Sequence, residues 1–465
     1  MPGDFKCLSC DAANYKLMEK AKAEKIETVW DRAEAMQPQC GFGEMGLCCT
    51  NCSMGPCRIV KVSEDGPKRG ICGADEDTIA ARNLARAIAA GSAAHSDHGR
   101  DIAHALHYAA KNPESGYEIK NAEKLISLAR EWGIDAENRD LKEVAEKVAE
   151  LALQEFGKPF GHLKFTERAT KGRQDIWNKM NVTPRAIDRD IVEVLHSTHI
   201  GCDADYRNIM TAATRAALCD GWGGSMIGTE LSDILFGIPE PHEVEANLGV
   251  LKANEVNIVI HGHEPTLSEA ILVAVCDPEL IELAKKQGAE GINLVGMCCT
   301  GNEIAMRHNV PMAGNFFQQE LAIVTGVVDA MVVDVQCIMP ALSQVAKCYH
   351  TKLITTSPKA KIPGAIHMQF DEAKAIESAK RIVREAVLNF KNRTGNIFIP
   401  EEKSKGLVGF SNESIIKALD GVTNSFAHPQ GTVKPLVDAI KSGVLRGAVA
   451  IVGCNNHKVP QDKGH

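Results

Sequence analysis

The sequence predicts an α/β protein, with an N-terminal helical domain that binds metal clusters followed by Rossmann-like parallel α/β domains. Three observations support this fold class. A glycine-rich stretch at 40–72 carries six cysteines, helical segments and turns follow up to about residue 235, and apolar runs of strand length then alternate with helices. We therefore expect a helical domain at 1–235, a Rossmann-like domain at 236–400, and the start of a second, truncated Rossmann-like domain at 401–465.

The composition excludes several classes of protein. A chain of 465 residues is long enough for two or three domains, and its net charge of −8 leaves no basic surplus to neutralise a nucleic acid or an anionic membrane surface. The first residues, MPGDFKCLSC, lack the apolar core of a secretion signal, and no apolar run is long enough to span a membrane. We expect a cytoplasmic protein, in which the 16 cysteines bind metals more readily than they form disulfides.

The N-terminal segment is expected to form one helix from Tyr15 through Met36. Cys7 and Cys10 precede this helix as a C-x2-C pair, a spacing that occurs in many metal sites. No partner pair lies nearby, so an unligated, mobile terminus is the favoured interpretation and metal binding is the alternative.

The spacing of the cysteines at 40–72 indicates an iron–sulfur cluster. A C-x2-C-x4-C segment followed by a distant fourth cysteine is typical of thiolate-bound clusters, and it is formed by Cys49, Cys52, Cys57 and Cys72. Zinc is the alternative, but it usually takes two C-x2-C pairs or a mixture of cysteine and histidine.

Two cysteines of the same stretch, Cys40 and Cys48, are half of what a cubane cluster needs. A symmetric dimer presents the same patch from both subunits, so a two-fold axis would complete the set at the interface. The alternative is that one or both are free thiols.

A row of titratable side chains follows. The alanine-rich run at 75–91 predicts one helix, and Gly91 and Ser92 are expected to end it and to begin a second helix. The second helix places polar side chains at steps of three residues: His95, His98, Asp101, His104 and His107. Such a row could conduct protons because histidine titrates near neutral pH, and a solvated polar face is an equally good interpretation.

Soft metal ligands follow the predicted strands beyond residue 236. The strand-like segments are VNIVIHGHEP, INLVGMCCTGN, DAMVVDVQCIMP, KLITTSP and GAVAIVGCNN. In a parallel sheet the ligand site lies at the carboxyl ends of the strands. The ligands delivered there are His261 and His263, Cys298 and Cys299, Cys337, and Cys454. Mixed thiolate and imidazole donors suit iron or nickel with sulfide, so a second and chemically distinct metal site is expected.

Several of these segments together resemble a known family. CGFGEMGLCCTNCSMGPCRI, AHSDHGRDIAHAL, SDILFGIPEP, HGHEP, VGMCCTGNE, DVQCIMP and GCNNHKVPQD are similar to the anaerobic nickel–iron–sulfur carbon monoxide dehydrogenases, and particularly to the catalytic subunit of acetogen-type enzymes. The resemblance runs along essentially the whole chain in the expected order.

The resemblance implies roles for individual residues. The internal relay [4Fe-4S] cluster would be held by Cys49, Cys52, Cys57 and Cys72, and half of a [4Fe-4S] cluster shared across a homodimer by Cys40 and Cys48. The catalytic [Ni-4Fe-4S] cluster would be held by His263, Cys299, Cys337 and Cys454. His95 would exchange protons at the catalytic site, and His98, Asp101 and His104 would continue the proton path. The family has a histidine where this chain has Asp101, whose lower pKa makes it a different relay group.

The implied reaction is CO + H2O ⇌ CO2 + 2H+ + 2e−, with electrons passing through the [4Fe-4S] clusters to a ferredoxin-like acceptor. In acetogen-type enzymes an acetyl-CoA synthase subunit is a further partner. Members of the family continue beyond the end of this sequence, where they supply two more cysteines and a lysine. We therefore expect a truncated chain that holds iron–sulfur clusters but little nickel.

Two other interpretations compete with this one. The first is a truncated, non-catalytic electron-transfer or dimerisation fragment. The second is a hybrid-cluster redox enzyme of related architecture, which lacks the six-cysteine block and the HGHEP and CCTGN pair.

Overall fold

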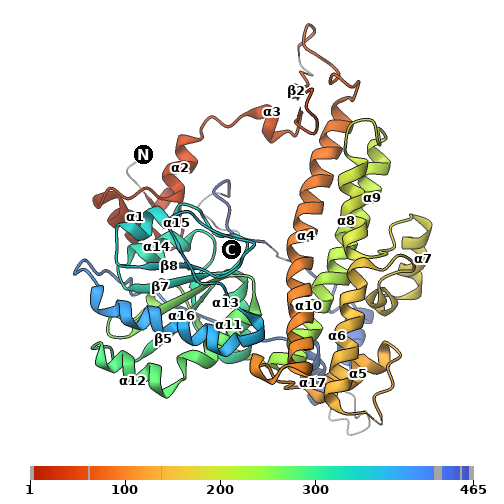
Figure 1. Cartoon of the computed structure of the whole chain (residues 1–465). Coiled ribbons are helices and arrows are strands. Elements are labelled where there is room, and N and C mark those ends of the chain that lie inside the picture. Colours follow the sequence, from red (N-terminus) through yellow and green to blue (C-terminus); the bar gives the residue numbers. More distant parts are fainter. Residues whose placement is uncertain (1–4, 61–62, 138, 424–431, 451–452, 460–465) are drawn as a thin grey trace. The chain divides into compact units, whose positions relative to one another are not determined.

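The computed structural model describes residues 5–60, 63–137, 139–423, 432–450 and 453–459. The chain forms two compact units. Unit 1 comprises residues 1–35, 114–116 and 236–465, and unit 2 comprises residues 36–113 and 117–235. Figure 1 shows both. The predicted fold class is confirmed, because unit 2 is helical and unit 1 is built on a largely parallel sheet. Among the helices of the described residues, none is long and apolar enough to cross a membrane.

Unit 1 contains an eight-stranded sheet of order β10-β3-β6-β5-β4-β7-β8-β9. Its strands are β3 (His242–Ala246), β4 (Val256–Gly262), β5 (Ile292–Met297), β6 (Met312–Gly314), β7 (Val328–Val333), β8 (Lys352–Thr355), β9 (Ile366–His367) and β10 (Ser404–Val408). Only β10 among these strands pairs antiparallel, with β3. Every residue of β4 and of β7 is buried, as expected for central strands of a parallel sheet with both faces covered.

Helices cover both faces of this sheet (Figure 1). One face carries α11 (Pro265–Val275), α13 (Cys298–His308) and α16 (Ala375–Asn389), and α12 (Pro278–Lys286) packs on α16. The other carries α1 (Ala12–Ala23), α14 (Gln318–Val324) and α15 (Leu342–Lys347). Unit 1 also contains η1 (Phe5–Cys7), α2 (Val29–Ala35), η5 (Leu248–Val250), η6 (Glu372–Lys374), η7 (Phe390–Asn392), α17 (Asn412–Thr423) and α18 (Lys434–Lys441).

Unit 2 is organised around α4 (Glu76–Lys111), a helix of 36 residues. Asp75 caps its N-terminus by accepting a hydrogen bond from the Thr78 amide at 3.0 Å. Along α4 pack α6 (Leu141–Gly157), α8 (Ile187–Ser197) and α9 (Tyr206–Cys219), side by side in Figure 1. The remaining elements are α3 (Gly41–Glu44), β1 (Cys48–Cys49), β2 (Cys57–Arg58), α5 (Ala122–Glu131), η3 (Lys164–Arg168), α7 (Lys171–Lys179), the π-helical η4 (Asp220–Ser225) and α10 (Met226–Phe236). The short η2 (Pro113–Ser115) begins in unit 2, and its last two residues belong to unit 1.

Two expected helix boundaries are wrong. The single N-terminal helix expected from Tyr15 through Met36 is two helices, α1 and α2, because Lys25 takes a left-handed backbone conformation (φ 59°) that ends α1. The break expected at Gly91 and Ser92 does not exist, because α4 continues through both. One glycine costs a helix only about 1 kcal/mol relative to alanine. Ser92 is buried against α9 and donates a hydrogen bond to the Ala216 carbonyl at 3.1 Å.

The strand expected at 447–456 is also absent from its described residues, 447–450 and 453–456; residues 451 and 452 lie outside the described part. The sequence prediction missed β3, β6, β9 and β10 instead. These strands are short or have few apolar residues, so their hydrophobic pattern is weak.

Candidate metal centres

Four cysteines of unit 2 converge on one cavity. The two-residue strands β1 and β2 pair antiparallel and set Cys49 opposite Cys57. One cavity is lined by both of these residues and by Cys52 and Cys72. The four positions predicted from spacing to hold a cluster therefore do surround one space.

The polar groups around this cavity suit an anionic occupant. The Ile71 amide donates to Cys57 Sγ at 3.4 Å, and the Ala74 amide and then the Arg82 guanidinium lower the pKa of Cys72. Two further N–H groups that line the same cavity, Asn51 Nδ2 and Arg82 Nε, are buried without a hydrogen-bond partner. A buried N–H without an acceptor is costly. Four thiolates with sulfide bridges would supply the missing acceptors, so these residues fit a [4Fe-4S] cluster.

The remaining cysteines of this stretch lie outside the lining of that cavity. Cys40 is exposed and precedes α3, and the backbone amides of Gly43 and Phe42 lower its pKa. Cys48 is half-buried in β1. Neither cysteine of this pair lines the four-cysteine cavity.

The predicted strand-end ligands of unit 1 also come together. His263 follows β4, Cys299 is the second residue of α13, which begins directly after β5, and Cys337 follows β7. His263 Nε2 lies 4.0 Å from Cys337 Sγ. Burial, followed by the neighbouring Cys454 and Cys337, raises the pKa of Cys299 to about 11. These four residues form the strand-end site.

The electrostatics of the strand-end site call for a cation. Burial and then the neighbouring Cys454 raise the pKa of Cys337, and burial followed by three nearby cysteines raises that of Cys298. Thiols crowded in this way stay neutral, because ionised thiolates would be poorly solvated and would repel one another. Bound metal ions would remove both costs, so the donor set fits a cluster that contains iron and nickel.

Asp334 joins the two loops that carry His263 and Cys337. Its carboxylate accepts hydrogen bonds from the backbone amides of His263 at 2.7 Å and Glu264 at 2.9 Å. The carboxylate also occupies the space next to Gly262 (φ 134°), where an added Cβ would lie 1.6 Å from Asp334 Oδ1. Burial raises the pKa of Asp334 to about 7. The sequence analysis missed this residue, although an acid directly after a buried strand was a usable signal.

Gln319 on α14 is a second residue that the sequence did not reveal. Its Nε2 donates to the Cys337 carbonyl at 3.2 Å, and its Oε1 accepts from the Met339 amide at 2.8 Å. The same Oε1 lies 3.1 Å from Nε2 of His261, which is fully buried and whose pKa burial lowers to about 4. His261 is thus a neutral partner of Gln319, while His263 approaches the cysteines.

The predicted row of titratable side chains lies on the unbroken helix α4. His95 Nδ1 lies 3.2 Å from Asp220 Oδ2, and this hydrogen bond raises the pKa of His95. The approach of η4 to α4 depends on glycine, since a Cβ at Gly99 would lie 2.3 Å from the Gly224 carbonyl oxygen. The next members of the row, His98, Asp101 and His104, have interactions of their own, and His104 is exposed.

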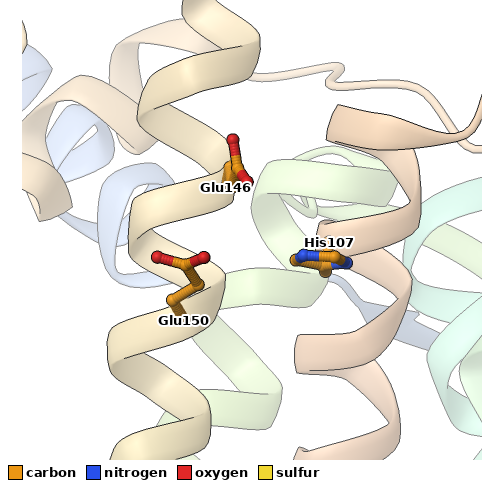
Figure 2. A group of neighbouring side chains, drawn as sticks. All are labelled: His107, Glu146 and Glu150. Atoms are coloured by element: carbon orange, nitrogen blue, oxygen red, sulfur yellow. The ribbon is translucent and has the colours of Figure 1, made fainter.

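His107 at the far end of the row meets two carboxylates of α6. Figure 2 shows His107 facing Glu146 and Glu150, and one ligand atom of each lies within 4.8 Å of the others. Lys111 Nζ lies 2.6 Å from Glu146 Oε1 and already supplies a positive charge there. Glu146 therefore already has a cationic partner in Lys111.

The other cysteines do not join either site. Cys7 and Cys10 are exposed. Of four further cysteines without a ligand-spaced neighbour in the sequence, Cys219 is buried, and Cys202, Cys276 and Cys348 are exposed.

Comparisons with known proteins agree with this geometry. The model of the Prismane/CO dehydrogenase family matches residues 47–465. Carbon monoxide dehydrogenase 1 of Methanosarcina mazei is 53% identical over 458 residues, which cover 98% of this chain and 71% of that protein. The carbon monoxide dehydrogenase/acetyl-CoA synthase subunit beta of Moorella thermoacetica is 45% identical, with coverage of 98% and 67%.

Solved structures give the same result. A nickel-free carbon monoxide dehydrogenase from Thermococcus sp. AM4 superposes with a TM-score of 0.94 at 50% identity, covering 99% of this chain and 71% of the other.

Proposed function

The chain belongs to the Prismane/CO dehydrogenase family, and from this premise we propose how its two cysteine sites divide the oxidation of carbon monoxide between them. The activity is that of a carbon monoxide dehydrogenase, an oxidoreductase that converts CO and water reversibly to CO2, two protons and two electrons. One observation supports this assignment of two roles. Cysteine and histidine side chains gather in one group within unit 1 and in another group within unit 2.

The strand-end site of unit 1 is the proposed catalytic centre. His263, Cys299, Cys337 and Cys454 would hold the nickel–iron–sulfur cluster, which when bound supplies a Lewis-acidic and redox-active centre for CO and water. Asp334 and Gln319 orient the loops of His263 and Cys337 through the backbone bonds described above. Hydrogen bonds of this kind, made to the backbone beside metal ligands, hold the ligands in their binding geometry.

Proton transfer is assigned to α4. Asp220 orients the imidazole of His95 and stabilises its protonated form, which suits a group that takes up a proton and passes it on. His98, Asp101 and His104 follow at steps of one helical turn and would carry protons outward.

Electron transfer is assigned to unit 2. The [4Fe-4S] cluster at Cys49, Cys52, Cys57 and Cys72 would receive electrons singly, and a second [4Fe-4S] cluster between Cys40 and Cys48 of two copies would pass them to a ferredoxin-like acceptor. The exposure of Cys40 and the separation of this pair from the relay cavity support a shared cluster in a homodimer.

The Moorella relative supports an acetyl-CoA synthase subunit as a further partner. An anaerobic, reducing cytoplasm would keep such thiolates reduced.

The test is CO-dependent reduction of a viologen dye by anaerobically purified protein reconstituted with iron, sulfide and nickel, with iron and nickel counted in the same sample. The variant H263A is expected to lose at least about 100-fold in dye reduction and to keep the iron of the relay cluster. C276S, which replaces an exposed cysteine just after α11 and outside both sites, is the matched control and should keep full activity. Unchanged CO oxidation in H263A would contradict the assignment of the catalytic centre.

A further inference from the structure

The cavity of the relay cysteines holds two buried donors that the coordination of iron does not use. Asn51 lies between Cys49 and Cys52 in the chain, and its Nδ2 has no hydrogen-bond partner. Arg82 reaches the same cavity from the first turns of α4, and its Nε is also buried without a partner.

Arg82 is held rigidly in this place. It is 4% exposed, and one of its terminal nitrogens donates to the Asp203 carbonyl at 2.8 Å. The other terminal nitrogen lies 4.0 Å from Cys72 Sγ. A guanidinium that lines the cavity and lies beside the thiol of Cys72 can donate hydrogen bonds to an anionic group bound there.

We propose that Asn51 and Arg82 donate hydrogen bonds to the sulfur atoms of the relay cluster and thereby raise its reduction potential. This inference rests on the proposed function, since it requires a [4Fe-4S] cluster at Cys49, Cys52, Cys57 and Cys72.

The physical reason is the charge of the cluster. Reduction by one electron, which the oxidation of CO supplies, adds one negative charge to an already anionic group of thiolates and sulfides. Hydrogen bonds and a nearby cation stabilise the reduced form more than the oxidised form, so they make the cluster easier to reduce. Arg82 contributes a full positive charge and Asn51 only a dipole, so Arg82 has the larger effect.

The test is a redox titration of the holoenzyme, monitored by the EPR signal of the reduced cluster. The relay cluster's signal is identified as the one that C52S removes. In R82Q the ratio of reduced to oxidised cluster at a fixed potential should fall about tenfold, which is about 59 mV for a one-electron couple. R82K, which keeps the charge, should shift less than R82Q, and N51A should shift a few-fold in the same direction.

Arg86 provides a matched control. It lies one turn further along α4, donates to the Leu195 carbonyl, and does not line the cavity, so R86Q should leave the titration unchanged. An unshifted potential in both R82Q and N51A, with the relay signal present, would overturn the inference. If R82Q fails to assemble the cluster, an unshifted potential in both R82K and N51A would overturn the inference. A wild-type protein without a signal that depends on Cys52 would refute the relay cluster itself, which is a different outcome.

Discussion

The two cysteine sites differ in what surrounds the sulfur atoms. Around the relay cavity of unit 2, backbone amides and Arg82 point at the thiols, and they lower the pKa of Cys72. At the strand-end site of unit 1, burial and crowding with other cysteines raise the pKa of Cys299 and of Cys337. One site is built to stabilise negative charge, and the other stabilises it only with a bound metal ion.

This difference matches the division of work that we propose. A relay cluster must take up and release an electron with little rearrangement, which fixed N–H donors favour. A catalytic centre must hold a reactive metal tightly, and ligands that gain most from the metal's positive charge contribute to that.

The largest expected effect is the loss of the relay cluster. C52S should lower the iron content by about four atoms per chain, since the serine hydroxyl replaces one of four thiolate ligands. Iron is counted after anaerobic purification. The control C276S, at an exposed cysteine outside both sites, should keep all its iron. An equal iron content in C52S and the wild type would contradict an iron–sulfur cluster in the relay cavity of unit 2.

A smaller loss of iron is expected at the interface pair. C40S/C48S should lower iron by about two atoms per chain, the share of one subunit in a shared cluster, and should leave the relay EPR signal in place. Iron counting and EPR of the same sample check this. A loss of the relay signal in this variant would show that the two sets of cysteines are not separate.

At the strand-end site, D334N should lower the free energy of unfolding by about 1–3 kcal/mol. The new amide group would face a backbone N–H that now donates to the carboxylate, and a buried donor would lose its acceptor. Urea denaturation measures this. The control is D371N, since Asp371 accepts one exposed amide, that of Ala373, in the same unit. Equal stability of D334N and the wild type would show that Asp334 does not secure the His263 loop.

The smallest expected effect is on the titration of His95. Its pKa is raised in the folded protein by Asp220, so the pair stabilises the fold fully below the ordinary histidine pKa and loses this contribution as the pH rises through the raised pKa. D220N should move the pKa of His95 down toward its ordinary value. Hydrogen–deuterium exchange of the imidazole, followed by mass spectrometry over pH, measures it. D188N, which removes a partner of Arg100 and not of a histidine, should leave it unchanged. If D220N leaves the pKa of His95 unchanged, the hydrogen bond to Asp220 is not what raises that pKa.

The sequence predicted which cysteines and histidines lie near one another better than it predicted their surroundings. Cys49, Cys52, Cys57 and Cys72, expected together from their spacing, line one cavity, and His263 and Cys337, expected together at strand ends, are neighbours. Both expectations depend on local chain geometry. Gln319 lies on a helix far along the chain from the ligand it supports, so no local pattern reveals it. Arg82 was hidden for the same reason, since a buried arginine has no signature of its own in an alanine-rich helix.

The errors in the fold also have a physical cause. Gly91 and Ser92 have weak helix propensity, but packing of α4 against its neighbours overrides it. The apolar pattern at 447–450 favours a strand, yet pairing with other strands decides whether one forms. The antiparallel strand β10 has residues that are mostly exposed, so its pattern carried little information.

The central claim, that the two sites differ in how they stabilise thiolates, is tested most directly by alkylation of metal-free protein. Iodoacetamide reacts with thiolates, and mass spectrometry gives a rate for each cysteine as a function of pH. At pH 8 we predict that Cys72 reacts at least about tenfold faster than Cys299 and Cys337, with Cys299 gaining reactivity only toward pH 11. Urea-unfolded protein serves as the reference in which all cysteines should react alike. Rates at Cys299 and Cys337 that equal the rate at Cys72 in the folded protein would contradict the account.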